Sequence, residues 1–246
     1  IIDRELAVKA FFVISGGLIW TSAARTENVM SYFKKRFFRI YPAYIFALVF
    51  FSLISFFIYS SDVNEIFSYL FWNSLFLNFL HPCIGNMFEN NTLCAVNGSL
   101  WTLKLEVGFY IFVGFCFYMF KRKSLVILIG FTFISVLLSF IFTILMPDVI
   151  NPVFMNQLPF MFFYFGLGAT LFSFYSKLSV KNNSFIFLCV AFFYFVSDLF
   201  YPLFIVSFVY YIAYGLPFKI ELSKLGDLSY GTYIFHFPII QIFISL

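Results

Sequence analysis

Long, uninterrupted apolar runs limit most strongly what this chain can fold into. Residues 40–59, for example, contain no charged side chain, and about 20 apolar residues in a helix are enough to cross the hydrocarbon core of a bilayer. A membrane β-barrel would show short segments of alternating polarity instead. We therefore expect an all-α, polytopic integral membrane protein built as a helical bundle.

Eight stretches are candidates for spanning helices, of which the sixth is short for a crossing. They are residues 6–23, 38–59, 100–120, 125–146, 153–174, 185–196, 200–216 and 228–246. A ninth apolar run, residues 66–80, is also short and contains the polar residues Asn73, Ser74 and Asn78. Whether this ninth run crosses decides the orientation of every segment after it.

The positions of the basic residues bear on the ninth run. Cationic loops lie at residues 34–39, 121–123, 177–181 and 219–224. Cytoplasmic loops carry an excess of Lys and Arg, and all four loops can be cytoplasmic only if residues 66–80 do not cross. We therefore predict a re-entrant or interfacial segment there, beside about eight spanning helices.

The composition agrees with a membrane protein and excludes other classes. Of the 246 residues, 63% are hydrophobic and only 11% charged, whereas soluble domains carry about 25% charged residues. The net charge of +4 is small and lies mainly at segment ends, which argues against nucleic-acid binding and is typical of inner-leaflet anchoring. The sequence contains no internal repeat and no soluble second domain, so we expect one membrane domain over residues 1–246.

The predicted topology places residues 81–98, with Cys83 and Cys94, outside the cytoplasm. Two cysteines eleven residues apart in an oxidising compartment can form a disulfide, and two free thiols are the alternative. His81 adds one side chain able to bind a metal, but the spacing matches no zinc site. We expect no metal centre.

The densest charge cluster has four cations within residues 31–44, SYFKKRFFRIYPAY. On a helix, Arg36 and Arg39 are three residues apart and share a face. Two interpretations are open for this pair, a topology signal and a phosphate clamp. Because guanidinium groups bind phosphate bidentately, a phosphorylated ligand on the cytoplasmic side is a reasonable hypothesis.

Residues 97–110, NGSLWTLKLEVGFY, carry one carboxylate into an apolar stretch. Glu106 lies seven residues past Ser99, which puts it about 10 Å inside the helix, and it shares one face with Thr102 and Tyr110. A carboxylate at that depth is costly and needs a partner or a wet cavity. A structural ion pair is the alternative to the functional role that we favour.

Residues 226–238, GDLSYGTYIFHFP, bring one of only two histidines into the last apolar stretch. Tyr233 and His236 belong to an i, i+3, i+4, i+7 stripe that starts at Ser229. A histidine there is either hydrogen-bonded packing or a functional group. It also lies about 10 Å deep, but on the opposite side of the membrane from Glu106, so we do not expect the two to form a catalytic dyad.

Residues 10–19, AFFVISGGLI, are an apolar run interrupted by Ser15, Gly16 and Gly17. Small residues in a membrane helix allow two backbones to approach closely. Close helix packing therefore explains the three residues, and the wall of a ligand pocket is the alternative.

These four stretches, in this order, resemble the membrane acyltransferase-3 family over essentially the whole chain. Members of that family O-acylate sugars of lipopolysaccharide, capsule, peptidoglycan or exported glycans. The resemblance implies a multi-pass protein of the bacterial inner membrane. It also implies acyl-CoA, commonly acetyl-CoA, as co-substrate, no permanently bound cofactor, and an acceptor hydroxyl on a glycan or lipid-linked sugar.

The resemblance also implies roles for individual residues. Arg36 and Arg39 match the family's RxxR pair and would hold the donor's phosphates. Glu106 would order the acceptor side or a proton path, and His236 would support catalysis. The acceptor or pocket side would include Ser15, Trp101, Tyr110 and Tyr233.

One departure from the family pattern concerns the general base. Family members carry a preceding helix with a basic residue, followed by a histidine that acts as the base, and no histidine precedes residues 10–19 here. The chain either begins after that helix or is an inactive copy. We favour truncation, because residues 1–9 resemble the tail of a connecting loop.

The rival prediction is a transporter or flippase for an anionic solute or lipid-linked sugar. It would use Glu106 and His236 as polar residues along a pathway. The sequence does not contain the matching halves that many transporters have.

Overall fold

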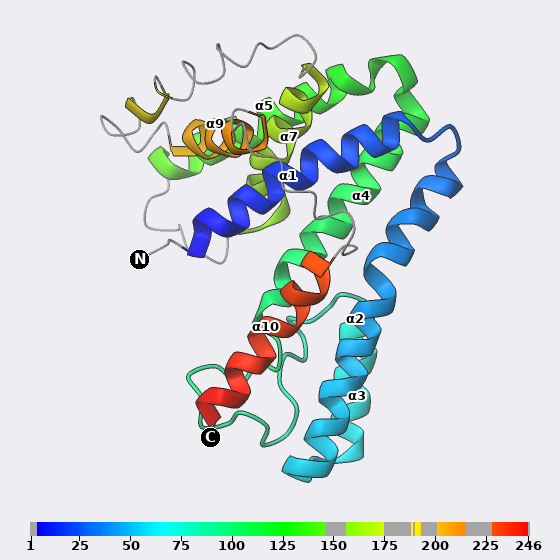
Figure 1. Cartoon of the computed structure of the whole chain (residues 1–246), viewed down its shortest axis with the longest axis vertical. Coiled ribbons are helices and arrows are strands. Elements are labelled where there is room, and N and C mark those ends of the chain that lie inside the picture. The colour runs from blue at the N-terminus through cyan, green and yellow to red at the C-terminus, as the bar shows by residue number, and fades with distance from the viewer. Residues whose placement is uncertain are drawn as a thin grey trace. The chain divides into compact units, whose positions relative to one another are not determined.

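The computed structural model describes residues 4–145, 156–174, 188, 190–192, 201–214 and 228–245. Within these residues the chain forms α-helices and short 3-10 turns but no strand (Figure 1). Contacts divide the helices into two compact units, one of Ile1–Phe33 with Leu105–Ile220 and one of Lys34–Lys104 with Glu221–Leu246.

The described helices occupy seven of the eight predicted spans, which confirms the all-α membrane fold class. The remaining predicted span, residues 185–196, lies mostly outside the described residues. The helices are α1 (Arg4–Ala24), α2 (Val29–Tyr59), α4 (Trp101–Phe120), α5 (Ser124–Leu145), α7 (Leu158–Phe174), α9 (Tyr201–Tyr214) and α10 (Leu228–Ser245).

Four helical stretches in the described part of the chain are long and apolar enough to cross a membrane. They are Leu6–Ala24, Val29–Tyr59, Gly98–Phe120 and Ser124–Phe142. The apolar helical stretches Leu158–Phe174 and Tyr201–Ala213 are shorter. The protein is therefore a membrane protein, and the number of crossings stays a prediction.

The first unit is built on a close contact between α1 and α7. A Cβ added at Gly16 would collide with the carbonyl oxygen of Phe165, and one added at Gly168 would collide with the carbonyl oxygen of Val13. The two backbones therefore touch, as small residues allow in membrane helices. Close helix packing therefore explains why residue 16 is a glycine.

Aromatic rings fill the space beside this contact. Phe109 of α4 packs edge-on against Phe12 of α1, with ring centroids 5.4 Å apart, and stacks on Phe165 of α7 at 4.4 Å. All three side chains are fully buried. Phe12 belongs to the AFFVISGGLI stretch, so that stretch and the helix that carries Glu106 share one core.

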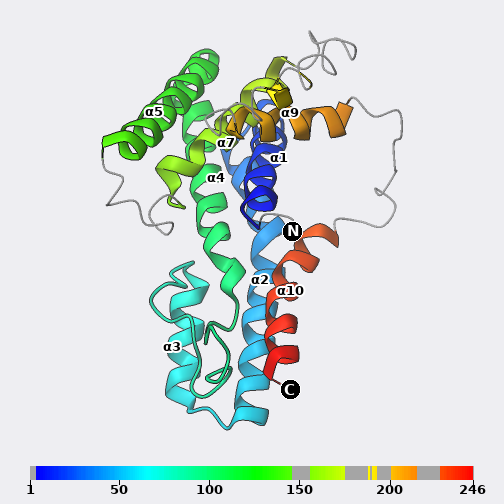
Figure 2. The same cartoon turned by 90° about the vertical axis from the view of Figure 1, so that its left-hand side faces the viewer.

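The second unit contains an antiparallel pair of α2 with α3 (Val63–Ser74). At the turn, Ser55 and Ser61 are hydrogen-bonded at 2.8 Å, and at the far end the Tyr44 hydroxyl donates to the Asn73 carbonyl at 2.6 Å. Figures 1 and 2 both show α3 alongside the C-terminal part of α2.

With 12 residues, α3 is about 18 Å long, which is short of the about 30 Å of a hydrocarbon core. The length agrees with the prediction that the ninth apolar run does not cross, and its re-entrant or interfacial placement stays a prediction. The helix and the apolar run overlap only in part, because α3 begins three residues before the run and ends at Ser74.

The end of α3 is a Schellman motif that uses phenylalanine where glycine is usual. The Phe76 N–H donates to the Asn73 carbonyl at 2.8 Å, and the Leu77 N–H donates to the Trp72 carbonyl at 3.0 Å. Phe76 has a φ of 60°, in the left-handed region that favours glycine. Its ring stacks on Tyr44 at 4.7 Å, which helps to hold the turn.

Two expectations about loops need correction. Residues 34–39 were expected as a loop, but α2 begins at Val29 and contains all of them, because Lys and Arg are good helix formers. Residues 4–9 were expected as the tail of a loop, but they form the first turns of α1. Lys121–Lys123 is a short 3-10 turn between α4 and α5, and residues 177–181 and 219–224 lie outside the described residues.

Candidate functional site

Glu106 and Tyr110 lie one turn apart on α4 and are joined by a hydrogen bond. The Tyr110 hydroxyl donates to Oε1 of Glu106 at 2.5 Å, and the two residues are only 5% and 4% exposed. Hydrogen bonds to an ionised carboxylate are stronger than neutral ones and fix its orientation. The predicted common face of α4 thus brings two candidate site residues into contact.

The first unit holds this pair in place from α1 and from the start of α2. The Tyr32 hydroxyl donates to the Tyr110 carbonyl at 3.2 Å, and Phe109, beside Tyr110, packs in the aromatic core. Ser15 is buried on α1, 7% exposed, in the same unit. The assignment of Ser15 to a ligand pocket stays a prediction.

Arg36 and Arg39 lie on α2, one turn apart, in the second unit. Arg36 is half-buried, and its Nε and Nη1 atoms are shielded from solvent, whereas Arg39 is exposed. The two predicted members of a phosphate clamp therefore differ in environment. Because two of its nitrogens are buried, the Arg36 guanidinium is restricted in the orientations it can adopt. The exposed guanidinium of Arg39 can reach a ligand.

The entry to α4 is attached to the middle of α10 through a proline. Pro238 lies inside α10 and has no N–H, so the carbonyl of Ile234, one turn earlier, loses its helical donor. The side-chain amide of Asn97 donates to that carbonyl at 2.8 Å. Asn97 also caps the 3-10 turn Gly98–Leu100 by accepting from the Ser99 N–H at 3.1 Å.

Tyr233 reinforces this attachment. Its hydroxyl donates to the Ser99 carbonyl at 2.9 Å and is in close contact with Oγ1 of Thr102. Thr102 in turn donates to the Ser99 carbonyl at 3.0 Å. The segments NGSLWTLKLEVGFY and GDLSYGTYIFHFP, more than a hundred residues apart in sequence, therefore meet through buried polar groups.

His236 lies one turn after Tyr233 and its side chain is exposed. Its Nδ1 is 2.6 Å from the Tyr233 carbonyl oxygen, and the two rings are 5.6 Å apart. Tyr233 and His236, predicted separately as pocket and catalytic residues, are thus neighbours in one arrangement.

Trp101 at the start of α4 and Gly98 in the 3-10 turn before it complete this region. Trp101, a predicted pocket residue, is half-buried at the first position of the helix. Gly98 lies against the ring of Phe237, and a Cβ added at Gly98 would be only 2.6 Å from the Cζ atom of that ring. Close approach to Phe237 is therefore a reason for glycine at this position.

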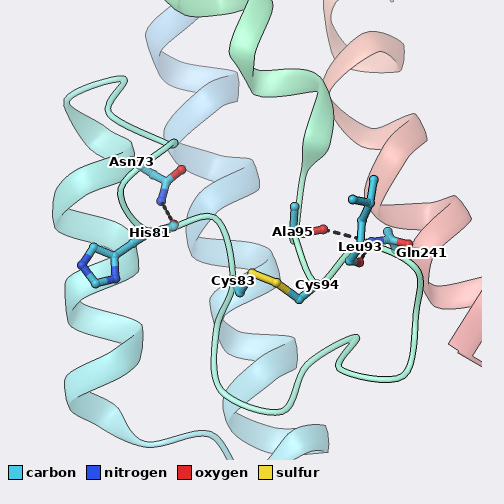
Figure 3. The surroundings of a disulfide bond; sticks show 7 residues. All are labelled: Asn73, His81, Cys83, Leu93, Cys94, Ala95 and Gln241. Atoms are coloured by element: carbon cyan, nitrogen blue, oxygen red, sulfur yellow. Dashed lines mark hydrogen bonds between the residues drawn. A yellow bond between two sulfur atoms is a disulfide. The ribbon is translucent and has the colours of Figure 1, made fainter. Parts of the chain in front are cut away.

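Cys83 and Cys94 are joined by a disulfide, with Cα atoms 5.4 Å apart (Figure 3). The linked loop is fastened to α10 by Gln241, whose Nε2 donates to the carbonyls of Leu93 at 2.6 Å and Ala95 at 3.0 Å. Gln241 is 4% exposed. The disulfide and the glutamine together hold the loop against the second half of α10.

Sequence reasoning missed Gln241 and the contact from Asn97 to α10. Gln241 is a polar residue in an apolar helix, and its cost in such a helix is the signal that could have found it. For the partner of Asn97 the signal was Pro238, which leaves the Ile234 carbonyl without a helical donor, but nothing in the sequence shows that Asn97 is the residue that reaches it. Among the described residues, no group of His, Cys, Asp and Glu could hold a metal ion.

The candidate site residues fall into both units. Ser15, Glu106 and Tyr110 belong to the first, whereas the arginine pair, Trp101, Tyr233 and His236 belong to the second. The expectation that Glu106 and His236 form no dyad therefore stays a prediction.

Comparisons with known proteins place the chain in a family. The acyltransferase-3 family model, described as an acyltransferase domain, matches residues 4–246. An "O-acetyl transferase" of Shigella phage Sf6 is 31% identical over 140 residues. That alignment covers 53% of this chain and 40% of the relative, so the chain matches less than half of the relative's length. No solved structure matches. Because the family model matches nearly the whole chain, this protein belongs to the acyltransferase-3 family.

Proposed function

We propose that this protein is an integral-membrane O-acyltransferase of a bacterial inner membrane. It moves an acyl group, acetyl in our proposal, from acyl-CoA to a hydroxyl of a cell-surface or lipid-linked sugar. The observation that carries the proposal is the family match over residues 4–246, which takes in all four motifs. The name of the phage relative, O-acetyl transferase, supports an acetyl group and an oxygen acceptor.

Arg36 and Arg39 bind the phosphates of the donor in this proposal. Their spacing on α2 and the restricted direction of the Arg36 guanidinium support a fork that meets a phosphate with two parallel hydrogen bonds. Lys cannot form such a fork. The neighbouring Lys34 and Lys35 are exposed and serve as topology signals.

Glu106 acts on the acceptor side, with Tyr110 as the residue that orients its carboxylate. In the reaction, a base takes the hydroxyl proton and the acceptor oxygen attacks the thioester carbonyl. The carbon–oxygen bond forms, the carbon–sulfur bond breaks, and CoA leaves as a thiolate that takes up a proton. The resemblance assigns this base to a histidine in a helix before the AFFVISGGLI stretch. Glu106 orders the acceptor or a proton path.

Transfer of labelled acetyl from acetyl-CoA into a glycan fraction tests this proposal. The assay uses membranes that contain the complete gene product. We expect R36K and R39K each to raise the KM for acetyl-CoA about ten- to a hundredfold, because a charge-assisted hydrogen bond is worth about 1.5–3 kcal/mol. The matched control K34R changes a nearby exposed cation and should leave this KM unaltered.

Two results would contradict parts of the proposal. An unchanged donor KM in both arginine variants would remove the phosphate clamp. Absence of transfer by the wild-type protein, together with movement of the sugar across the membrane, would instead support a transporter.

A further inference from the structure

The hydrogen bond of His236 determines where its ring carries a proton. Nδ1 lies 2.6 Å from the Tyr233 carbonyl oxygen, and a carbonyl oxygen can only accept. The proton must therefore be on Nδ1. Since a neutral imidazole carries one N–H, the other nitrogen, Nε2, has a lone pair.

The carbonyl that selects this tautomer is itself held in place. The Tyr233 side chain is anchored at its hydroxyl, which donates to the Ser99 carbonyl at 2.9 Å and contacts Thr102. The next residue, Ile234, is fully buried, and its carbonyl accepts from Asn97. Two successive residues of α10 are thus attached to the entry of α4.

The Tyr233 ring also limits the orientation of the imidazole. The two ring centroids are 5.6 Å apart and the planes are inclined by 45°. A hydrogen bond on one edge and a ring contact on one face together favour one orientation of His236. The side chain is exposed, so it can meet a ligand.

We propose that His236 presents Nε2 as a hydrogen-bond acceptor to a ligand hydroxyl, and that Tyr233 is the positioning residue that selects the tautomer. Hydroxyls can donate to Nε2, and both substrates of the proposed acyl transfer carry them. The acceptor sugar has ring hydroxyls, and the CoA donor has hydroxyls on its pantetheine and ribose. This inference rests on the proposed function for its ligand, but the tautomer does not depend on it.

Nuclear magnetic resonance of the complete protein with ¹⁵N-labelled histidine tests the tautomer directly. The H236N variant assigns the His236 signals by their disappearance. We expect a protonated Nδ1 and an unprotonated Nε2 in the neutral ring. A proton on Nε2 with Nδ1 unprotonated would overturn the proposal, whether or not the protein transfers acyl groups.

Kinetics of two variants then test the role of Nε2. In H236N the side-chain amide nitrogen can replace the Nδ1 donor, but no atom replaces Nε2. We therefore expect the KM for one substrate to rise about two- to tenfold, the effect of losing one neutral hydrogen bond. In H236Q the longer side chain can return an acceptor near the Nε2 position and should recover part of the loss. H81N changes the other histidine, which stacks on Trp72, and should leave both KM values unchanged.

The KM that changes identifies the source of the hydroxyl. A higher KM for the sugar assigns it to the acceptor, and a higher KM for acyl-CoA assigns it to the donor. If neither KM changes in H236N while transfer proceeds, the inference is wrong and the proposed function stands. If the wild-type protein transfers nothing, the proposed function fails, and the resonance experiment alone decides the tautomer.

Discussion

Asn97 donates its side-chain amide to the carbonyl oxygen of Ile234, 2.8 Å away and 137 residues later in the chain. Pro238 makes this bond necessary, because it leaves that carbonyl without a helical donor. Asn97 is 6% exposed and Ile234 is fully buried, so water cannot replace the donor easily. Together with the bond from the Tyr233 hydroxyl to the Ser99 carbonyl, this bond attaches the NGSLW segment to α10.

Removal of the Asn97 amide should destabilise the protein. We expect N97A to lower the free energy of unfolding by about 1–3 kcal/mol, the cost of leaving a buried carbonyl unsatisfied. Thermal unfolding in detergent measures the change. In a P238A background, a backbone N–H can return to Ile234 and N97A should cost less. Equal costs in both backgrounds would show that Pro238 and Asn97 are not coupled.

Gly16 should be far less tolerant of alanine than Gly130. The added Cβ at Gly16 meets the backbone of Phe165, whereas nothing lies within 4 Å of a Cβ at Gly130. We expect G16A to destabilise by about 1–3 kcal/mol through overpacking. G130A should stabilise by about 0.5–1 kcal/mol, because alanine favours helix more than glycine does. Thermal unfolding of the pair tests the contact, and similar melting temperatures would contradict a close crossing of α1 and α7.

Two variants at Phe76 separate backbone strain from ring stacking. F76A loses the stacking on Tyr44 but keeps a side chain at a φ of 60°, whereas F76G loses the ring and relieves the left-handed conformation. We expect F76G to be more stable than F76A by about 1 kcal/mol. Chemical unfolding in detergent gives the difference. An alanine variant as stable as the glycine variant would contradict the Schellman ending of α3.

The Cys83–Cys94 disulfide should resist thiol reagents until it is reduced. Mass spectrometry with a maleimide, before and after reduction, should show two additional modified cysteines in a C116A/C189A background. C83S/C94S in the same background should lower the free energy of unfolding by about 2–4 kcal/mol. Modification of both cysteines without reduction would mean that the loop carries free thiols.

The positions of most helices could be predicted from the sequence, because a run of about 20 apolar residues is costly to place anywhere but in a spanning helix. Helix ends were less predictable. Residues 34–39, four of which are basic, were expected in a loop, yet α2 continues through them. A membrane boundary by itself does not end a helix. The end of α3 at Ser74 was missed because Phe76, not glycine, adopts the left-handed conformation.

Part of the candidate site could also be predicted from the sequence. The shared face of Glu106 and Tyr110 follows from the helical repeat, and the structure adds the hydrogen bond between them. The burial of Arg36 nitrogens and the exposure of Arg39 could not be predicted, since both residues have the same charge and lie in the same helix.

The sequence by itself determined the membrane class, the approximate helices and the four motifs, because these depend on local composition and on spacing along one chain. Only the tertiary structure decided that the NGSLW segment fastens to α10 and that Gln241 holds the disulfide-linked loop. The physical reason is that these bonds end on backbone carbonyls. Pro238 marks the Ile234 carbonyl as open, but every residue carries a carbonyl, so side-chain identity cannot show which distant side chain meets which carbonyl until the helices are packed.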